Sequence, residues 1–165
     1  MAKASEEKTN VMRVLDGKKV PYKHYCYVES GTTNGMEVAQ VLCQDPNQVF
    51  KTLVTVCGKT NKNYVFVIPG NKELDLKKAA KAGGEKSIEM LKSKDLLGLT
   101  GYIHGGCSPI GMKKFFTTTI HESAKDFDTI IFSAGKIGYQ VEVSLEGLAK
   151  VIRYDLKDIV VDEEV

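Results

Sequence analysis

The chain has 165 residues and a mass of 18.2 kDa, and its 42% hydrophobic and 27% charged residues are typical of a globular protein. This composition excludes a disordered, collagen-like or fibrous chain. The sequence has no run of roughly 18 to 20 apolar residues and no signal-peptide pattern at its start, so we expect a cytoplasmic protein without membrane contact. No repeat, low-complexity tract or linker divides the sequence, which predicts a single domain over residues 1–165.

Charge is distributed unevenly along the chain, although the net charge is only +2. Residues 155–165 contain five acidic residues and one lysine, a balance of −4, which leaves +6 on residues 1–154. Of the 23 basic residues 21 are lysines, which supply mobile point charges rather than bidentate forks. Such a surface is better suited to contact a phosphate backbone than to recognise individual bases. A lysine-rich surface that only keeps the protein soluble fits the composition equally well.

The cysteines and histidines do not form a recognisable metal motif. The four cysteines, which have no C-x-x-C spacing, are Cys26, Cys43, Cys57 and Cys107. Free cysteine packs as a small hydrophobe, so we expect structural thiols. The three histidines are scattered, and we therefore expect no metal and no cofactor.

The first quarter of the chain predicts two helices and one strand. Apolar residues at helical spacing predict a helix over residues 6–16, with Gly17 as a left-handed C-terminal cap. An aromatic and β-branched run predicts a strand over residues 22–28. Residues 31–35 are typical of a loop, and residues 36–43 have a helical pattern.

A hairpin and a helix are predicted next. The β-rich runs 51–57 and 64–68 are joined by a polar segment, which favours an antiparallel pair. Asp75 is a suitable N-cap for an alanine-rich helix over residues 76–82, and Gly83–Gly84 is suited to end that helix.

The rest of the chain predicts more strands than helices. Ser93 is expected to cap a short turn that reaches Leu97. Further elements are expected as strands over residues 116–120, 129–132 and 139–143 and as a helix over residues 144–151. Strands in adjacent pairs with irregularly inserted helices indicate an α+β fold with a mixed, largely antiparallel sheet flanked by helices.

Two glycine-rich segments, residues 101–111 and 133–138, stand out against this scaffold. Residues 105–111 contain three glycines and one proline, so their backbone can approach a ligand closely and direct several N–H groups to one point. A tight turn without a ligand is an equally simple interpretation. The segment has neither the P-loop pattern nor the G-x-G-x-x-G or G-x-S-x-G pattern, which argues against these nucleotide and hydrolase motifs.

Lysines are the other candidate functional residues. Lys51 opens an apolar run, so packing can hold its stem while its ammonium lies at the end of the sheet. Lys113 and Lys114 precede two phenylalanines, a pattern that suits a phosphate backbone held by lysines and a base stacked on a ring. Ordinary solvated lysines explain the pattern at Lys113 and Lys114 equally well, and a lysine placed like Lys51 is more often a plain surface residue than a functional one.

The sequence gives little support for nucleophilic catalysis by the protein. Cys107 lies three residues after His104, but this spacing in a glycine-rich loop does not establish a working pair. Ser108 and Ser133 lack the local context of a catalytic triad. An enzyme with this sequence is therefore expected to rely on binding and on stabilisation of developing charge.

In combination these segments resemble a known family. Four segments occur in the order found in bacterial Cys-tRNA(Pro) deacylases. They are Phe50–Val54, Leu76–Lys81, the stretch Gly-Gly-x-Ser-Pro-x-Gly-x-Lys-Lys from Gly105 and the stretch Ser133–Gly138. These are free-standing relatives of the editing domain of prolyl-tRNA synthetase. The resemblance extends from about Val11 to Asp162 and implies a curved mixed sheet that approaches a barrel, flanked by helices.

The resemblance also implies an activity, which is removal of cysteine wrongly attached to the proline tRNA. The family reaction is thought to use the substrate's own thiol, which expels the tRNA by cyclisation and makes the enzyme a hydrolase or a lyase. The implied partners are aminoacylated tRNA and prolyl-tRNA synthetase in a complex with tRNA, without DNA or membrane.

Roles for individual residues follow from the same resemblance. The implied catalytic residues are Lys51, which would hold the terminal nucleotide, Gly105 and Ser133. The implied substrate-binding residues are Tyr27, Gly106, Cys107, Ser108, Pro109, Gly135 and Gln140. The implied tRNA-binding residues are Lys113, Lys114 and Lys136.

One residue departs from the family pattern. Many relatives have aspartate where this chain has Gln140, which keeps the hydrogen-bonding capacity but not the charge.

Two other functions remain open at this point, namely a deacylase for alanine or another small amino acid and a tRNA-binding module without turnover.

Overall fold

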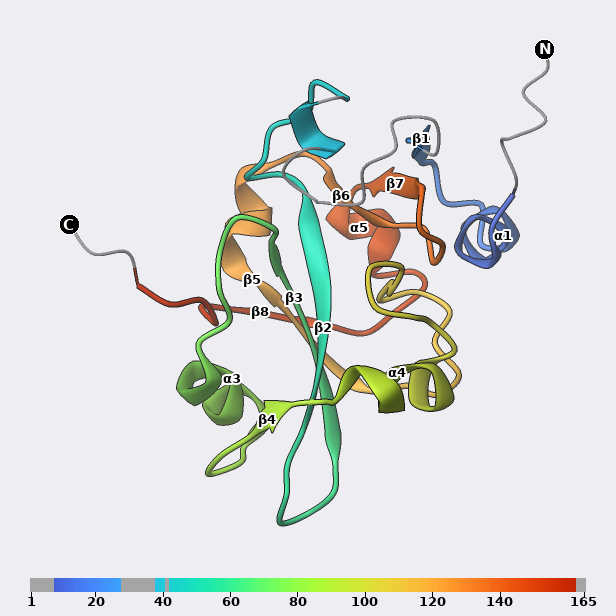
Figure 1. Ribbon diagram of the computed structural model, residues 1–165. Coiled ribbons are helices and arrows are strands. Elements are labelled where there is room, and N and C mark those ends of the chain that lie inside the picture. Colours follow the sequence, from blue (N-terminus) through green and yellow to red (C-terminus); the bar gives the residue numbers. More distant parts are fainter. Residues whose placement is uncertain (1–7, 28–37, 41, 163–165) are drawn as a thin grey trace.

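The computed structural model describes residues 8–27, 38–40 and 42–162 (Figure 1). The helices are α1 (Asn10–Gly17), α3 (Leu76–Gly83), α4 (Ser93–Thr100), α5 (Leu145–Leu148) and the 3-10 helix η3 (Glu122–Asp126). The strands are β1 (Lys23–Cys26), β2 (Phe50–Val56), β3 (Asn63–Pro69), β4 (Glu89–Met90), β5 (Thr117–His121), β6 (Ile130–Ser133), β7 (Tyr139–Val143) and β8 (Asp155–Lys157). Within this part of the chain no helix is both long and apolar enough for a membrane span.

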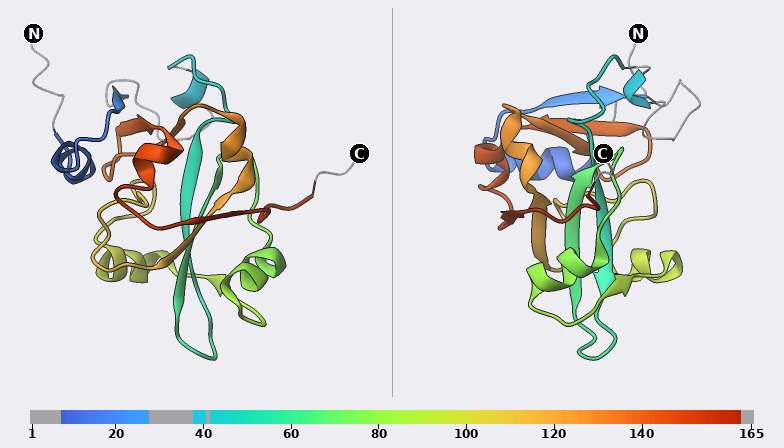
Figure 2. Two further views of the ribbon diagram at one scale, coloured as in Figure 1. Left: turned by 180° about the vertical axis from the view of Figure 1, so that it is seen from behind. Right: turned by 90° about the vertical axis from the view of Figure 1, so that its left-hand side faces the viewer.

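The strands form two sheets that meet near the start of β2. The larger sheet has the order β4-β2-β3-β5-β8 and the smaller one the order β1-β7-β6. All pairs are antiparallel except β3 with β5 and β5 with β8. A bridge between Val49 and Ile131 joins the sheets, and Figure 2 shows the smaller sheet lying across one end of the larger. The predicted α+β class with a mixed, largely antiparallel sheet is confirmed, and over the residues described the two sheets do not close into a barrel.

Strand β3 explains how the core is divided. Val65 and Val67 pack into a cluster that also holds residues from both sheets and from α1. Phe66 and Ile68, on the opposite face, pack with α3. Because β3 is covered on both faces, its sequence is continuously apolar rather than alternating.

The predicted hairpin and most predicted elements are confirmed. Asp75 caps α3 by accepting hydrogen bonds from two backbone N–H groups, and Gly84 ends the helix at φ +76°. Ser144 caps α5, whose described length is four residues rather than the eight expected. In the expected helix 36–43 residues 38–40 are helical and 42–43 form a turn, whereas the other positions lie outside the described residues, as does the loop 31–35.

Two predicted helix ends are wrong. Gly17 is the last residue of α1 and Lys18 is its cap, and the left-handed conformation occurs at Lys19, with φ +58°. Ser93 is the first residue of α4 rather than its cap, and the helix continues to Thr100 instead of ending near Leu97. The short strands β4 and β8 were not predicted, because two or three mostly exposed residues have no periodicity to detect.

Candidate active site

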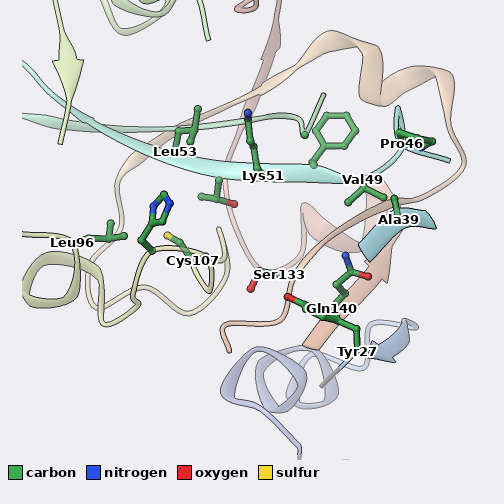
Figure 3. Close-up of a pocket in the computed structure, with 15 residues that line it drawn as sticks. Tyr27, Ala39, Pro46, Val49, Lys51, Leu53, Leu96, Cys107, Ser133 and Gln140 are labelled. Carbon is green, nitrogen blue, oxygen red and sulfur yellow. The ribbon is translucent and has the colours of Figure 1, made fainter. Parts of the chain in front are cut away.

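A cavity of about 400 Å³ lies where the start of β2, the end of β6, the start of β7 and the segment between α4 and β5 come together (Figure 3). Its lining combines apolar side chains with a few polar groups, as is usual for small-molecule sites. The lining residues are Tyr27, Ala39, Pro46, Val49, Phe50, Lys51, Thr52, Leu53, Gly70, Leu96, His104, Gly105, Cys107, Ser133 and Gln140.

One wall of the cavity is an edge of β2 that has no strand beside it in the described part of the chain. Strand β4 pairs only with Thr55 and Val56, so it stops short of the residues that line the cavity. The N–H of Gly70 donates to the carbonyl of Val49, and by the alternation of an antiparallel pair the backbone groups of Thr52 point away from β3. The Thr52 Oγ1 is also buried and has no hydrogen-bond partner among the described residues. Thr52 therefore brings polar groups to the cavity wall that have no partner within the described ranges.

Lys51 lies at the rim of the cavity as the second residue of β2. Its side chain projects from the face opposite that of Thr52, and Figure 3 shows it on the far side of β2 from Ser133 and Gln140. Burial by the surrounding walls lowers the pKa of the ammonium, whereas the charge of Glu73 acts in the opposite direction. The ammonium is thus suited to hold an anion outside the cavity rather than to act within it.

The two glycine-rich segments pack against each other. A Cβ on Gly106 would lie 3.2 Å from the backbone nitrogen of Ile137, and one on Gly135 would lie 2.8 Å from the Tyr102 ring. Gly105, which lines the cavity, and Gly135 both have φ +88°, a conformation that other residues rarely adopt. The close packing and these angles require glycine and fix where the Gly105 backbone meets the cavity.

Hydrogen bonds within residues 101–111 hold this segment in shape. The Tyr102 hydroxyl donates to the carbonyl of Ile110 at 2.5 Å, and the Ser108 Oγ accepts from the N–H of Ile110 at 3.3 Å. Ser108 is fully buried, and neither Ser108 nor Pro109 is a lining residue. These residues support the wall from behind it.

The floor of the cavity comes from paired strands of the smaller sheet, where Ser133 of β6 is opposite Gln140 of β7. The Ser133 Oγ accepts a hydrogen bond from the N–H of Gly135 at 3.1 Å. The Gln140 Oε1 accepts one from the Nε2 of Gln44 at 2.8 Å, and in Figure 3 the Gln140 amide nitrogen points to the cavity. Tyr27 lies beside this pair, with its hydroxyl directed toward Ser133 (Figure 3). The floor is polar but carries no charge.

Cys107 is the one thiol among the described lining residues, and it is poorly suited to attack a substrate. Its side chain is almost wholly buried, and burial raises the pKa of the thiol to about 12. A thiol with this pKa is almost entirely protonated at neutral pH, and the thiolate is the nucleophilic form. Among the described residues no group of three His, Cys, Asp or Glu side chains is placed to hold a metal.

The structure brings six of the thirteen implied site residues together in the lining of the cavity. Lys51, Gly105 and Ser133 line the cavity, as do three of the implied substrate-binding residues, Tyr27, Cys107 and Gln140. The remaining four support the walls from outside the lining, namely Gly106, Ser108, Pro109 and Gly135. The implied tRNA-binding lysines lie elsewhere: Lys113 and Lys114 line a separate groove, and the Lys136 Nζ lies 5.5 Å from the centre of the Tyr139 ring.

Comparison with known proteins gives consistent results. A model of the aminoacyl-tRNA editing domain matches residues 30–151. A protein of Enterococcus faecalis (strain ATCC 700802 / V583) with the provisional name Cys-tRNA(Pro)/Cys-tRNA(Cys) deacylase EbsC is 49% identical over 162 residues, which is 98% of both chains.

Solved structures share the fold at low sequence identity. The crystal structure of the hypothetical protein APE2540 has a TM-score of 0.83 at 20% identity and covers 94% of this chain and 100% of its own. A structure provisionally described as a trans-editing enzyme for prolyl-tRNA synthetase has a TM-score of 0.78 at 21% identity, covering 92% of this chain and 95% of its own. Because the editing-domain model matches residues 30–151 and a deacylase relative is 49% identical, the chain belongs to the aminoacyl-tRNA editing family, within its Cys-tRNA(Pro) deacylase group.

Proposed function

We propose that this chain acts as a single editing domain that removes cysteine from mischarged tRNA(Pro). The observation that carries the proposal is the cavity itself, which offers hydrogen-bonding groups around a small volume but no ionised nucleophile among its described residues. The relative of 49% identity, whose provisional name states this activity, supports the same substrate.

The need for such an enzyme follows from the size of the amino acids. Cysteine and proline are close in volume, and a synthetic pocket separates ligands that differ by a methylene by only about 1 to 3 kcal/mol. A second site that acts after transfer to tRNA corrects the remaining errors.

In the proposed reaction the cysteine side chain supplies the nucleophile. Its sulfur attacks the carbonyl carbon of its own ester, the new C–S bond closes a thiolactone, and the C–O bond to the terminal ribose breaks. The proton lost from the thiol balances the proton gained by the ribose oxygen, directly or through solvent. This step needs no protein nucleophile, which agrees with a buried, protonated Cys107.

The protein's part is to position the ester and stabilise developing charge. We assign the ammonium of Lys51 to the phosphate of the terminal nucleotide, because it stands at the rim rather than among the floor residues. We assign the backbone at Gly105 and the edge of β2 at Thr52 to the aminoacyl group, because both reach the cavity wall. Ser133, Gln140 and Tyr27 would then contact the amino acid from the floor.

The test is deacylation of tRNA(Pro) charged with cysteine, serine or alanine. We expect loss of cysteine alone, since the serine hydroxyl is a poor nucleophile at neutral pH and alanine has none. Lys51→Ala should lower the rate on the order of 100-fold while the protein stays folded by circular dichroism. Full activity in folded Lys51→Ala protein would remove the role assigned to this lysine.

The other outcomes separate the competing functions. Loss of alanine would indicate hydrolysis by bound water and a deacylase for small amino acids. Binding of tRNA without loss of any amino acid would indicate a module without turnover.

As a member of an aminoacyl-tRNA editing family, the chain takes tRNA as its substrate. We propose that selection of the proline tRNA depends on a complex with prolyl-tRNA synthetase and that the protein works in the cytoplasm, where charged tRNA is used. Co-purification of synthetase, tRNA and this protein is the test of that complex.

A further inference from the structure

Phe115 is a large apolar side chain left in solvent, with 65% of its surface exposed. It follows Lys113 and Lys114, which are also exposed, and comes just before β5. Its neighbour Phe116 is half-buried against the main core, and the carbonyl of Phe116 accepts a hydrogen bond from the Thr118 Oγ1 at 2.9 Å. Phe116 thus anchors the segment to the core, and the ring of the preceding Phe115 remains in solvent.

Two grooves meet at Phe115. One, of about 430 Å³, has Lys62 on its wall and extends along the first residues of β3 and β5. The other, of about 300 Å³, has Lys113 and Lys114 on its wall and extends to the segment after α5. Neither groove has an acidic side chain among its described lining residues.

Lys113 is partly oriented by its surroundings. Its stem lies 3.4 Å from the position of a Cβ on Gly101, and its Nζ is 3.4 Å from the carbonyl of Gly98. Lys62 and Lys114 are exposed. The three cations therefore border one exposed aromatic ring on two sides.

This surface is separate from the cavity but within reach of the same RNA. Thr117 is opposite Tyr64 of β3, which is opposite Thr55 of β2, so the grooves begin four residues along β2 from Lys51. Phe115 is two residues before Thr117, and β5 is two strands away from β2, so at about 3.3 Å per residue and about 4.8 Å between strands Phe115 lies about 20 Å along and about 10 Å across the sheet from Lys51. A nucleic acid whose terminal nucleotide is at Lys51 spans that distance with a few nucleotides.

We propose that Phe115 is a stacking platform for a base of the bound RNA, with Lys62, Lys113 and Lys114 on the phosphates to either side. The proposal rests on the proposed function only for the identity of the RNA. An aromatic ring beside lysines is the usual arrangement for binding strands without reading their sequence. A protein partner would be expected on a wider apolar patch with fewer lysines.

The test compares tRNA binding by Phe115→Ala, by Phe115→Tyr and by the unchanged protein. We expect Phe115→Ala to weaken binding about 10-fold and Phe115→Tyr to retain it, since tyrosine also stacks. Lys62→Gln with Lys114→Gln should reduce the slope of log K against log salt by about 1.4, which corresponds to two lost phosphate contacts on a single strand. Val161→Ala, which truncates another exposed apolar side chain, is the matched control and should bind like the unchanged protein.

A second substrate keeps this proposal distinct from the proposed function. Cysteine esterified to adenosine alone cannot reach Phe115, so Phe115→Ala should cleave it at the unchanged rate while losing efficiency on Cys-tRNA. RNA binding that depends on Phe115 without any deacylation would support the surface and refute the deacylase. Unchanged tRNA binding by Phe115→Ala, or weaker binding only to prolyl-tRNA synthetase, would overturn the proposal.

Discussion

The hydroxyl of Tyr102 provides the sharpest test of how the glycine-rich segment supports the site. Tyr102→Phe removes one oxygen and with it the hydrogen bond to the carbonyl of Ile110. Tyr102 is buried, and burial raises its pKa to about 12, so the hydroxyl is a donor at all working pH values. A hydrogen bond contributes about 1 kcal/mol net, and an unsatisfied buried carbonyl costs about 1 to 3 kcal/mol. We expect the free energy of unfolding to fall by about 1 to 2 kcal/mol.

The functional expectation is a fall in kcat/KM for Cys-tRNA(Pro) of about 5-fold, because the wall at Gly105 loses an anchor. Equilibrium urea unfolding and single-turnover deacylation measure the two effects. Tyr154→Phe is the matched control, since its hydroxyl also donates to a backbone carbonyl, that of Leu145 at 2.9 Å, away from the cavity. It should lose stability and keep its rate. A Tyr102→Phe protein that is destabilised but fully active would refute the link between this bond and the site.

Three further predictions follow from single residues. Because the pKa of Lys51 is lowered, its charge is lost at a lower pH than that of a free lysine. The deacylation rate should therefore fall on the alkaline side of a pH–rate profile. Lys51→Arg should shift that fall to higher pH. In the folded protein at neutral pH, iodoacetamide should label the exposed Cys43 and leave the buried Cys107 unmodified, which peptide mass spectrometry can show. The variant Cys107→Ala should retain deacylation activity. Gly135→Ala should lower the free energy of unfolding in the urea assay by about 1 to 3 kcal/mol, because φ is +88° and the new Cβ has no room. Gly98→Ala should raise the free energy of unfolding by up to about 1 kcal/mol, because a Cβ at that position of α4 lies in open space.

The elements that the sequence predicted well are those with a local cause. The hairpin of β2 and β3 has long β-branched runs, and α3 has a capping aspartate at one end and a left-handed glycine at the other. The end of α1 was misplaced because Gly17 resembles a left-handed cap, but the chain uses Lys19 for that conformation. Strand β8 could not be found, because its three residues form a strand only through pairing with β5.

The site was predictable where it coincides with motifs and hidden where it depends on packing. Gly105 and Lys51 are conspicuous in the sequence, but the edge of β2 at Thr52, which has no pairing strand among the described residues, results from the short length of β4. The sequence offers His104 as a neighbour of Cys107 and as one of three scattered histidines, and only the structure shows that it lines the cavity itself. Gln44 is 96 residues from Gln140, and only the tertiary structure reveals their hydrogen bond.

That hydrogen bond orients the polar group that Gln140 presents to the cavity, and this orientation predicts which part of a substrate the floor would hold. Because the Gln44 nitrogen donates to the Gln140 oxygen, the remaining polar group of Gln140 is an amide N–H donor. A donor stabilises an acceptor, such as the carbonyl oxygen of the ester or a thiolate as it forms, whereas an α-ammonium group needs an acceptor. An aspartate at this position would offer only acceptors and a negative charge, which would favour the ammonium and oppose the thiolate. A glutamine at this position therefore suits the reaction proposed above, in which the substrate's sulfur is activated, and the hydrogen bond from Gln44 orients its amide.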